Sequence, residues 1–439
     1  MATATRKRIR PIDVLLSPLR LLERLRGRRR VLLLIVYLML GLVAAFFAWW
    51  ATSLNDLPDV GDPFDVAAFI KSSRVHESEN AFVLYKEAAE AYQDQAIAHD
   101  WNVTYLAMRW GWAKADPKIQ TWVAANRRAL DLWRAGTTRP RGIAEDLATV
   151  QTFQEGIQNQ IAVLSQAAII EGLRLEAEGD RAGALDWYLA VGRASLHYST
   201  KSCIEWRRVA SMLDPLLNSR LIAWALDPKT DAALLRRAIS AIEEIDARTP
   251  LLSDNLKAEY IATMHALDDL PRLTRALDRL GSPTYPYSDW PRWHHVFWFA
   301  KREPDRSRRV ARLFFANWLA QCDKPPLARP KATGNHENHP IWGYFEASSD
   351  APPAAHAIEA AKLFAWLGST STLSRFLTTY PTYAPDAATD HRLRGTVLVH
   401  LAEQLHLRET GKDAPSIEAL VPRYLKVIPP DYVDMKTKP

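Results

Sequence analysis

The chain has 439 residues, of which 48% are hydrophobic and only 17 are glycine, and its formal net charge is +6 at pH 7. Residues 1–30 carry ten Lys or Arg against two acidic side chains, whereas the rest of the chain carries 46 basic and 48 acidic ones. Because the basic excess belongs to the N-terminal tail alone, the composition gives no support for nucleic-acid binding by the body.

The scarcity of glycine and the lack of alternating Val, Ile and Thr runs predict an all-α fold. We expect one N-terminal transmembrane helix, then a domain of helical hairpins of TPR-like or α-solenoid-like type, with a Pro-rich irregular segment. The expected boundaries are a basic cytoplasmic tail at 1–30, the transmembrane helix at 31–50, a linker at 51–63, the hairpin domain at 64–280, an aromatic and Pro-rich irregular segment at 281–355, and C-terminal helices with a Pro-rich turn at 356–439.

The basic tail contains an apolar stripe at helical spacing. Its members are Ile12, Leu15, Leu16, Leu19 and Leu22. With Ser17-Pro18 as a helix start, the stripe predicts a short amphipathic helix on the anionic inner leaflet. A disordered tail that only stops translocation is the alternative.

Val31 to Trp50 is a run of twenty residues without a charge or a proline, VLLLIVYLMLGLVAAFFAWW. At 1.5 Å per residue it spans roughly 30 Å, the thickness of a bilayer core. Three arginines precede it and two tryptophans end it, which predicts a cytoplasmic N-terminus and an exported body. A cleaved signal peptide is the competing interpretation, although the run is longer than such regions usually are. Gly41 and Ala45 form one small-xxx-small pair, so a homo-oligomer formed in the membrane is a further hypothesis.

The body shows repeated helix signals from Asn80 to about Leu270. Asp116-Pro117, Asp227-Pro228 and Thr249-Pro250 each place a capping side chain before a proline, which predicts three helix starts. The first helix is expected to continue through Trp133 and to end at Gly136. A second stripe predicts a buried helix face made of Leu235, Ala238, Ile239, Ile242 and Ile245.

Ile161 to Leu196 has the spacing of one tetratricopeptide unit. Small and apolar positions at Gly172 and Leu175 precede a Gly179-Asp180 turn, and Ala184 and Tyr188 follow. Small residues let two helices approach closely, so we expect a tight αα-hairpin here. No second copy follows at a 34-residue interval.

Aromatic residues are concentrated between 285 and 299. The candidate interaction surface consists of Tyr285, Tyr287, Trp290, Trp293 and Trp298. If exposed, such side chains would contact a partner or the outer leaflet. The alternative is that they fill the core where irregular chain meets helices.

Three histidine-containing clusters raise the question of a metal site. His336, Glu337 and His339 are spaced HExH, which does not place two imidazoles one helical turn apart. Glu403-x-x-His406, with His400 before it, lacks the second Glu-x-x-His of a di-iron site. The third cluster, His265 with Asp268 and Asp269, has the pattern of a polar helix end. We therefore name no metal ligand, no catalytic residue and no cofactor.

Cys203 and Cys322 are the only cysteines, and either a disulfide or two buried free thiols would fit their spacing. No nucleophile elbow or nucleotide-binding glycine loop is present in the sequence.

The C-terminal segment Thr396 to Asp431 combines a helix with Gly411, Pro415, Val421-Pro422, Tyr424-Leu425 and Pro429. It resembles the region after the long helix in type II secretion pseudopilins, but Val31–Trp50 lacks the prepilin glutamate, so the chain is not itself a pilin. Taken whole, the anchor, the Trp-rich helical body and this tail are similar to membrane-anchored helical proteins of planctomycete-type bacteria. That resemblance implies a helical fold and a bacterial envelope setting. Together with the apolar run, it leads us to expect a location in the bacterial inner membrane. From the residues themselves, we expect the tail to be a helix with a Pro-rich turn packed back on it.

The leading functional hypothesis is a single-pass scaffold of the bacterial envelope that binds a partner protein on the exported side. The alternative is a membrane-tethered enzyme, such as a metal-dependent hydrolase, with its site in residues 285–340.

Overall fold

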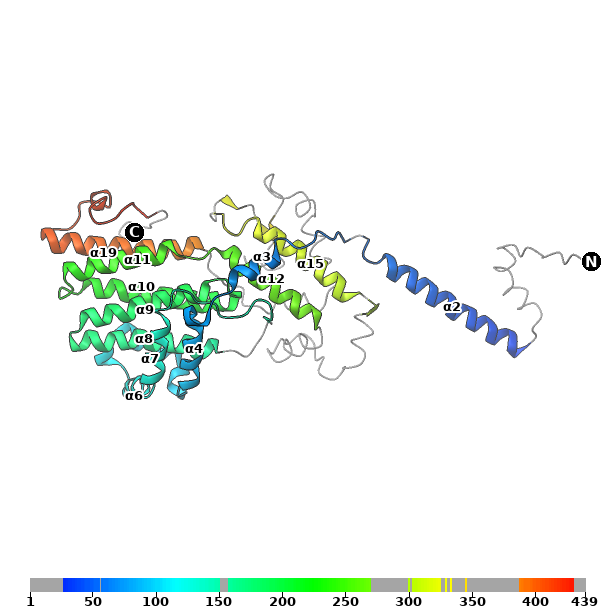
Figure 1. The fold of residues 1–439 in the computed structure, drawn as a ribbon, viewed down its shortest axis with the longest axis horizontal. Coiled ribbons are helices and arrows are strands. Elements are labelled where there is room, and N and C mark those ends of the chain that lie inside the picture. The colour runs from blue at the N-terminus through cyan, green and yellow to red at the C-terminus, as the bar shows by residue number, and fades with distance from the viewer. Residues whose placement is uncertain are drawn as a thin grey trace, which may run out of the picture. The chain divides into compact units, whose positions relative to one another are not determined.

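The computed structural model describes residues 27–55, 57–150, 157–269, 299–300, 302–324, 328–329, 332–333, 344–345 and 387–429. Most of these residues are helical, which confirms the all-α class (Figure 1). The one β ladder among them is an antiparallel pair of two-residue strands, β1 (Ala332–Thr333) and β2 (Tyr344–Phe345). The chain divides into two units, Met1–Pro58 with Trp290–Arg306, and Asp59–Asp289 with Ser307–Pro439.

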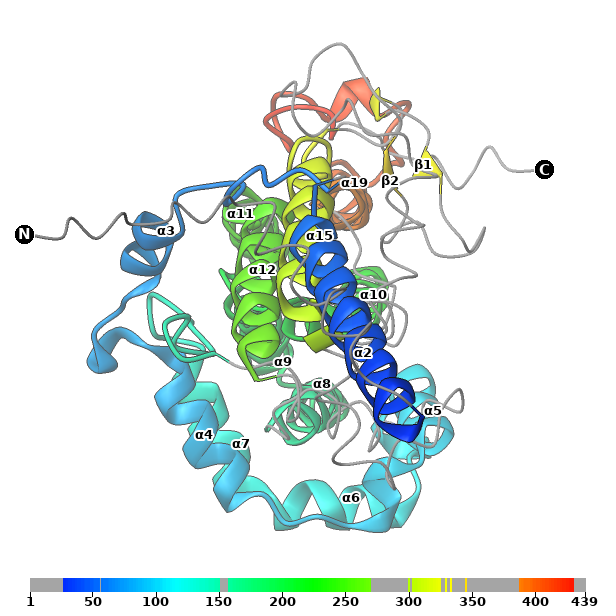
Figure 2. The ribbon, with the colours of Figure 1, turned by 90° about the vertical axis from the view of Figure 1, so that its right-hand side faces the viewer.

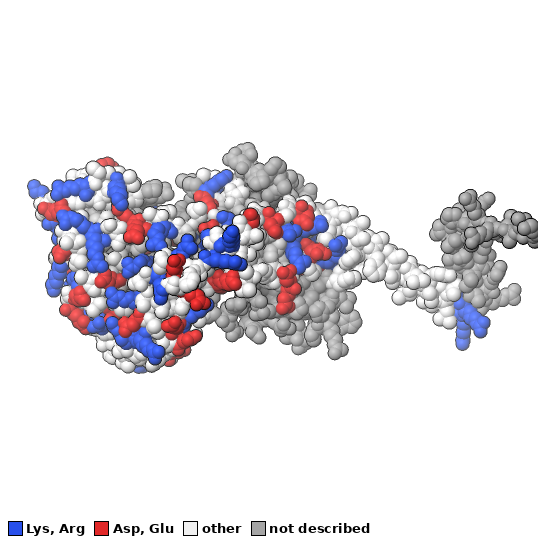
Figure 3. All heavy atoms as spheres, viewed as in Figure 1, with Lys and Arg blue, Asp and Glu red and all other residues white. Residues whose placement is uncertain are grey.

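The first unit contains α2 (Arg28–Thr52), which includes the whole predicted apolar run. Its 25 residues make it about 37 Å long at 1.5 Å per residue. None of its side chains is buried, and beyond Arg30 it carries no charge, so it is white in Figure 3 apart from the basic residues at its start. The helix is long and apolar enough to cross a membrane. The stripe predicted at residues 12–22 lies outside the described residues.

The second unit begins with short helices. Their bounds are α3 (Val66–Ser73), η1 (Glu77–Glu79), α4 (Ala81–Ala91), η2 (Ala96–His99), α5 (Trp101–Trp110), η3 (Trp112–Lys114), α6 (Pro117–Ala125) and α7 (Arg127–Gly136). Asp116 caps α6 as predicted, with its carboxylate accepting from Lys118 N at 2.8 Å. The predicted single helix from Pro117 to Gly136 is, however, two helices. The buried Asn126 side chain accepts from Gln93 N at 2.7 Å and donates to Gln93 O at 3.0 Å, and the chain bends at this residue.

Four longer helices follow (Figure 1): α8 (Gln158–Glu178), α9 (Arg181–Ser199), α10 (Ile204–Leu226) and α11 (Ala232–Ala247). Helix α9 packs against each of the other three. The α8–α9 pair is the tight hairpin that the sequence predicts. A Cβ atom on Gly172 would lie 2.4 Å from the Tyr188 ring, so only glycine permits this close approach. Gly179 ends α8 at a positive φ of 91°, and Asp180 caps α9 through Gly183 N at 2.8 Å. The assignment of this hairpin to the TPR class stays a prediction.

Two of the three predicted helix starts are wrong. After Asp227-Pro228 the chain makes a turn, and α11 begins four residues later with Asp231 as its cap. Likewise, α12 (Leu252–Asp268) begins at Leu252 instead of Pro250. The predicted buried face of α11 is confirmed, because Leu235, Ala238, Ile239, Ile242 and Ile245 are all buried.

Helix α15 (Glu303–Leu319) lies inside the segment predicted to be irregular, so that prediction is wrong for these residues. Its single proline, Pro304, is in the first turn, where a missing N–H breaks no helical hydrogen bond. The part of α15 within the second unit runs beside α12 in both ribbon views (Figures 1 and 2). Tyr260 and Phe315 join the two helices with ring centroids 5.4 Å apart.

Several residues of the predicted linker at 51–63 make specific contacts. Leu54 and Leu57 are buried. At the start of the second unit, Asp59 accepts from Arg312 at 2.9 Å, and Tyr260 donates to Asp62 at 2.5 Å. These contacts attach the beginning of the second unit to α12 and α15.

The last long helix, α19 (Ala387–Thr410), packs against both α10 and α11 (Figure 1). Buried polar contacts join it to α10, because Arg207 donates to Asp390 at 2.8 Å and Arg394 donates to Asp214 at 3.0 Å. The segment after α19 includes η6 (Glu418–Leu420) and packs back on the helix. Leu420, Tyr424 and Leu425 are buried in the same core as α4 to α11.

Candidate functional site

The predicted aromatic surface, Tyr285, Tyr287, Trp290, Trp293 and Trp298, lies outside the described residues. The same is true of His336, Glu337 and His339, and of about half of the 285–340 region named for an enzyme site. Phe299, the next aromatic residue along the chain, is described and is exposed.

The other two histidine clusters make ordinary surface contacts. His265 bonds with Val150 O at 2.9 Å, and its neighbour Asp268 pairs with Arg308 at 2.6 Å. His400 lies 3.3 Å from Glu403, whereas His406 bonds instead with Lys412 O at 3.0 Å. Within the described part of the chain, no three His, Cys, Asp or Glu side chains are grouped as a metal site would require.

Cys203 and Cys322 are both free and buried, which decides between the two alternatives that the sequence left open. Burial raises the pKa of the Cys203 thiol, and the nearby carboxylates Glu145 and Glu259 raise it further. Burial also raises the pKa of the Cys322 thiol, with Asp323 acting in the same direction. Both thiols are therefore protonated and poor nucleophiles at neutral pH.

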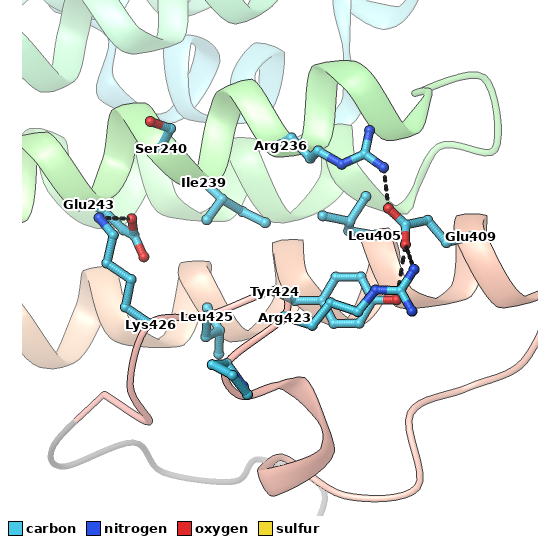
Figure 4. Close-up of a pocket in the computed structure, with 11 residues that line it drawn as sticks. Arg236, Ile239, Ser240, Glu243, Leu405, Glu409, Arg423, Tyr424, Leu425 and Lys426 are labelled. Atoms are coloured by element: carbon cyan, nitrogen blue, oxygen red, sulfur yellow. Dashed lines mark hydrogen bonds and ion pairs between the residues drawn. The ribbon is translucent and has the colours of Figure 1, made fainter.

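A groove lies between α11, α19 and the C-terminal turn, and we call it the α11–α19 groove (Figure 4). Its volume is about 370 Å³. It is lined by Arg236, Ile239, Ser240, Glu243, Leu405, Glu409, Pro422, Arg423, Tyr424, Leu425 and Lys426. The lining joins two segments that are far apart in the chain, on α11 and on α19 with its following turn.

Local structure explains how the turn forms one wall of the groove. Gly411, with a positive φ of 71°, ends α19 and reverses the chain. The buried residues Leu420 and Leu425 then hold the returning segment against the helices. The His406 ring contacts the Tyr424 ring edge-on, with centroids 5.4 Å apart.

The floor of the groove is apolar, and its ends are charged. Figure 4 shows Ile239, Leu405 and Leu425 converging between two ionic clusters. In one cluster, Glu409 pairs with Arg236, accepts from Arg423 at 2.7 Å and accepts from the Tyr424 hydroxyl at 3.0 Å. In the other, Lys426 pairs with Glu243 at 2.6 Å.

These pairs leave the positive charges on the outside. The Arg236, Arg423 and Lys426 side chains are 59%, 70% and 80% exposed, whereas those of Glu409 and Glu243 are 14% and 18% exposed. Burial would raise the pKa of Glu409, but the Tyr424 hydroxyl and the two arginines lower it below its ordinary value. Glu409 is therefore ionised at neutral pH, and the rim of the groove presents cations to solvent.

Sequence reasoning did not find this groove. It identified Tyr424-Leu425 and the returning turn, but no local signal connects them with Arg236 on α11. The signal that was available is the apolar character of Leu420 and Leu425 after the helix-ending Gly411. It predicts that the turn packs on a helix, but it does not predict which helix.

Comparison with protein-family models, with curated proteins and with solved structures found no match for the chain.

Proposed function

We propose that this protein is a membrane-anchored helical scaffold that binds a segment of a partner protein in the α11–α19 groove. The observation that carries the proposal is the groove itself, with an apolar floor of Ile239, Leu405 and Leu425 between two clusters whose exposed members are cations. Peptide-binding grooves combine such apolar pockets with charged rims, since the pockets give affinity and the charges give register.

The anchor in this proposal is α2. Its apolar length supports membrane insertion, and the charge asymmetry supports orientation, because Arg28, Arg29 and Arg30 precede the apolar run. We propose that the N-terminus is cytoplasmic, that the anchor crosses the bacterial inner membrane once, and that the body is on the exported side. Tethering to the bilayer would concentrate the scaffold where its partner is found.

The exposed cations favour one kind of partner. A segment with acidic side chains beside apolar ones would place its carboxylates near Arg236, Arg423 and Lys426 and its apolar groups over Leu405 and Ile239. A basic segment would meet three exposed like charges and would be rejected.

Peptide binding by the full-length protein in nanodiscs tests this proposal. Fluorescent peptides with alternating Leu and Glu are expected to raise the anisotropy on binding, whereas the same peptides with Lys in place of Glu are not. Exposed ion pairs contribute about 0.2–1 kcal/mol each. The double variant Arg236→Gln with Lys426→Gln should therefore weaken binding by about two- to thirtyfold.

The matched control is Arg128→Gln with Lys118→Gln, which removes two exposed cations from α7 and α6, outside the groove. This control should leave the affinity unchanged. If both double variants weaken peptide binding equally, the loss of affinity is explained by net charge and not by the groove. If the Glu and Lys peptides bind equally well, the proposed preference of the groove for acidic segments is excluded.

The orientation of the anchor is tested separately by protease treatment of intact spheroplasts. Digestion of the body with protection of the basic tail is expected. A body that survives intact would place it in the cytoplasm and would exclude the exported scaffold.

A further inference from the structure

Trp50, near the end of α2, is held by the short segment that precedes α15. Its indole Nε1 donates a hydrogen bond to Phe299 O at 2.7 Å. The Trp50 and Phe299 rings are stacked with centroids 5.2 Å apart. The Arg302 guanidinium lies over the Trp50 ring, 4.6 Å from its centroid. One tryptophan thus makes three kinds of contact with residues about 250 positions further along the chain.

Arg302 adopts an uncommon backbone conformation to make this contact. Its φ is +51°, in the left-handed region that non-glycine residues seldom occupy. Its N–H donates to the same Phe299 carbonyl, at 3.1 Å. The Phe299 carbonyl oxygen therefore accepts from both Trp50 and Arg302. Strained residues of this kind persist where surrounding contacts hold them, and they are found more often at functional positions.

The surroundings of Trp50 have the composition of a membrane–water interface. Trp49 and Phe299 are exposed apolar rings, and Arg302 adds a guanidinium that also pairs with the half-exposed Asp305 at 3.3 Å. Arg306 donates to Ser53 O at 2.6 Å, so a second contact follows the first by about one helical turn. Aromatic rings with a nearby arginine suit the headgroup layer, where the rings meet acyl chains and the cation meets phosphate.

We infer that Phe299 and Arg302 form a second membrane contact, in which Trp50 holds Phe299 at the acyl–headgroup boundary and Arg302 beside lipid phosphates. The inference rests on the proposed anchor. If the apolar run crosses the bilayer, Trp50 lies at headgroup depth, and groups stacked on its ring share that depth. The occupant of this surface is therefore the phospholipid headgroup layer on the side of the body.

The depth of this segment can be measured in the full-length protein in liposomes. A bimane label on Ala300→Cys reports the segment, one on Leu38→Cys reports the middle of the anchor, and one on Ala177→Cys reports an exposed site on α8. Cys203 and Cys322 are buried, so the reagent will select the introduced cysteines. Brominated lipids carry the quencher either just below the headgroups or deep in the acyl chains.

The expected result is that shallow bromine quenches the label at 300, deep bromine quenches the label at 38, and neither quenches the label at 177. Quenching at 38 without quenching at 300 would overturn the second membrane contact and leave the anchor intact. If the label at 38 is not quenched, the anchor fails, and the inference fails with it.

Adjacent tryptophans provide a matched pair of variants. Trp50→Ala removes the stacking and the hydrogen bond to Phe299, whereas Trp49→Ala removes an exposed ring that contacts Phe46. Quenching at 300 should fall to the level of the Ala177→Cys control in Trp50→Ala and should persist in Trp49→Ala. Equal losses in the two variants, or none in either, would show that Trp50 does not hold the segment at the membrane.

Discussion

Arg207 and Asp390 are 183 residues apart in the chain and form an ion pair of 2.8 Å that is almost completely buried. Arg207 also donates to Asn255 at 2.8 Å and to Pro250 O at 3.1 Å, so a single guanidinium joins α10, α12 and α19. Buried charges of this kind are tolerated when every donor finds an acceptor. The position of α19 therefore depends on a specific polar contact as well as on apolar burial.

The first prediction concerns this pair. Arg207→Met should lower the free energy of unfolding by about 3–5 kcal/mol, because the Asp390 carboxylate stays buried without its guanidinium. The neighbouring Arg208 pairs with Glu205 at the partly exposed surface, so Arg208→Met should cost less than about 1 kcal/mol. Denaturant unfolding of the detergent-solubilised protein, followed by tryptophan fluorescence, measures both. Similar losses in the two variants would contradict the special role of Arg207.

The second prediction concerns the α8–α9 hairpin. Gly172→Ala improves helix propensity by about 1 kcal/mol, yet it should destabilise the protein by about 1–3 kcal/mol, because the new methyl group meets the Tyr188 ring. In Gly192→Ala the clash at 2.9 Å is with the end of the Ile245 side chain, which can move, so the loss should be smaller. Thermal melting of both variants measures the difference. An increase in stability for Gly172→Ala would contradict the close approach of α8 and α9 at Gly172 and Tyr188.

The third prediction concerns pH. Burial, together with the charge of Arg248, lowers the pKa of His197 from 6.5 to about 4. Between these values the unfolded chain binds a proton that the folded protein does not, so the free energy of unfolding decreases as the pH falls from 6.5 to 4. The decrease assigned to His197 is up to about 3 kcal/mol.

His197→Asn provides the comparison for the pH prediction, because its side-chain oxygen can replace Nδ1, which lies 2.9 Å from the Tyr85 hydroxyl. The parent protein and His197→Asn have all other titrating groups in common. The difference between their curves of unfolding free energy against pH therefore gives the contribution of His197. Parallel curves from pH 7 to pH 4 would refute the assignment.

The fourth prediction concerns the thiols. Because Cys203 and Cys322 are buried and protonated, maleimide at pH 7 should not modify the native protein, and both thiols should react after denaturation. Mass spectrometry counts the adducts. Rapid modification of either cysteine in the folded protein would contradict its burial.

Local signals predicted much of the fold. The apolar run of α2, the Asp116 cap, the buried face of α11 and the close approach at Gly172 each depend on residues within a few turns of one another. The predicted helix starts were wrong where a hydrogen bond to a residue far away in the chain determines the local structure. Thr249, expected to start a helix, instead accepts a hydrogen bond from Arg394, and the carbonyl of the following Pro250 accepts from Arg207.

Asp227 and Asn126 show the same effect. The Asp227 carboxylate pairs with Arg181 and accepts from Lys229 N, so it closes a turn at the end of α10. Asn126 bonds with the backbone of Gln93, 33 residues earlier, and thereby divides a helix whose apolar pattern is continuous. The α11–α19 groove was beyond prediction for the same reason, since pairing Arg236 with Glu409 across 173 residues requires the folded arrangement.

The late position of α19 in the chain has a consequence for biogenesis. Helices α10 and α11 are synthesised well before α19, which covers part of their surface. Helix α19 can pack on them only after residues near 400 have been made and, in the proposed topology, exported. Until then an apolar strip and the Arg207 guanidinium lack their final partners, and nascent chains would need protection from aggregation during that interval. Chains truncated before α19 should consequently be substrates for quality-control proteases.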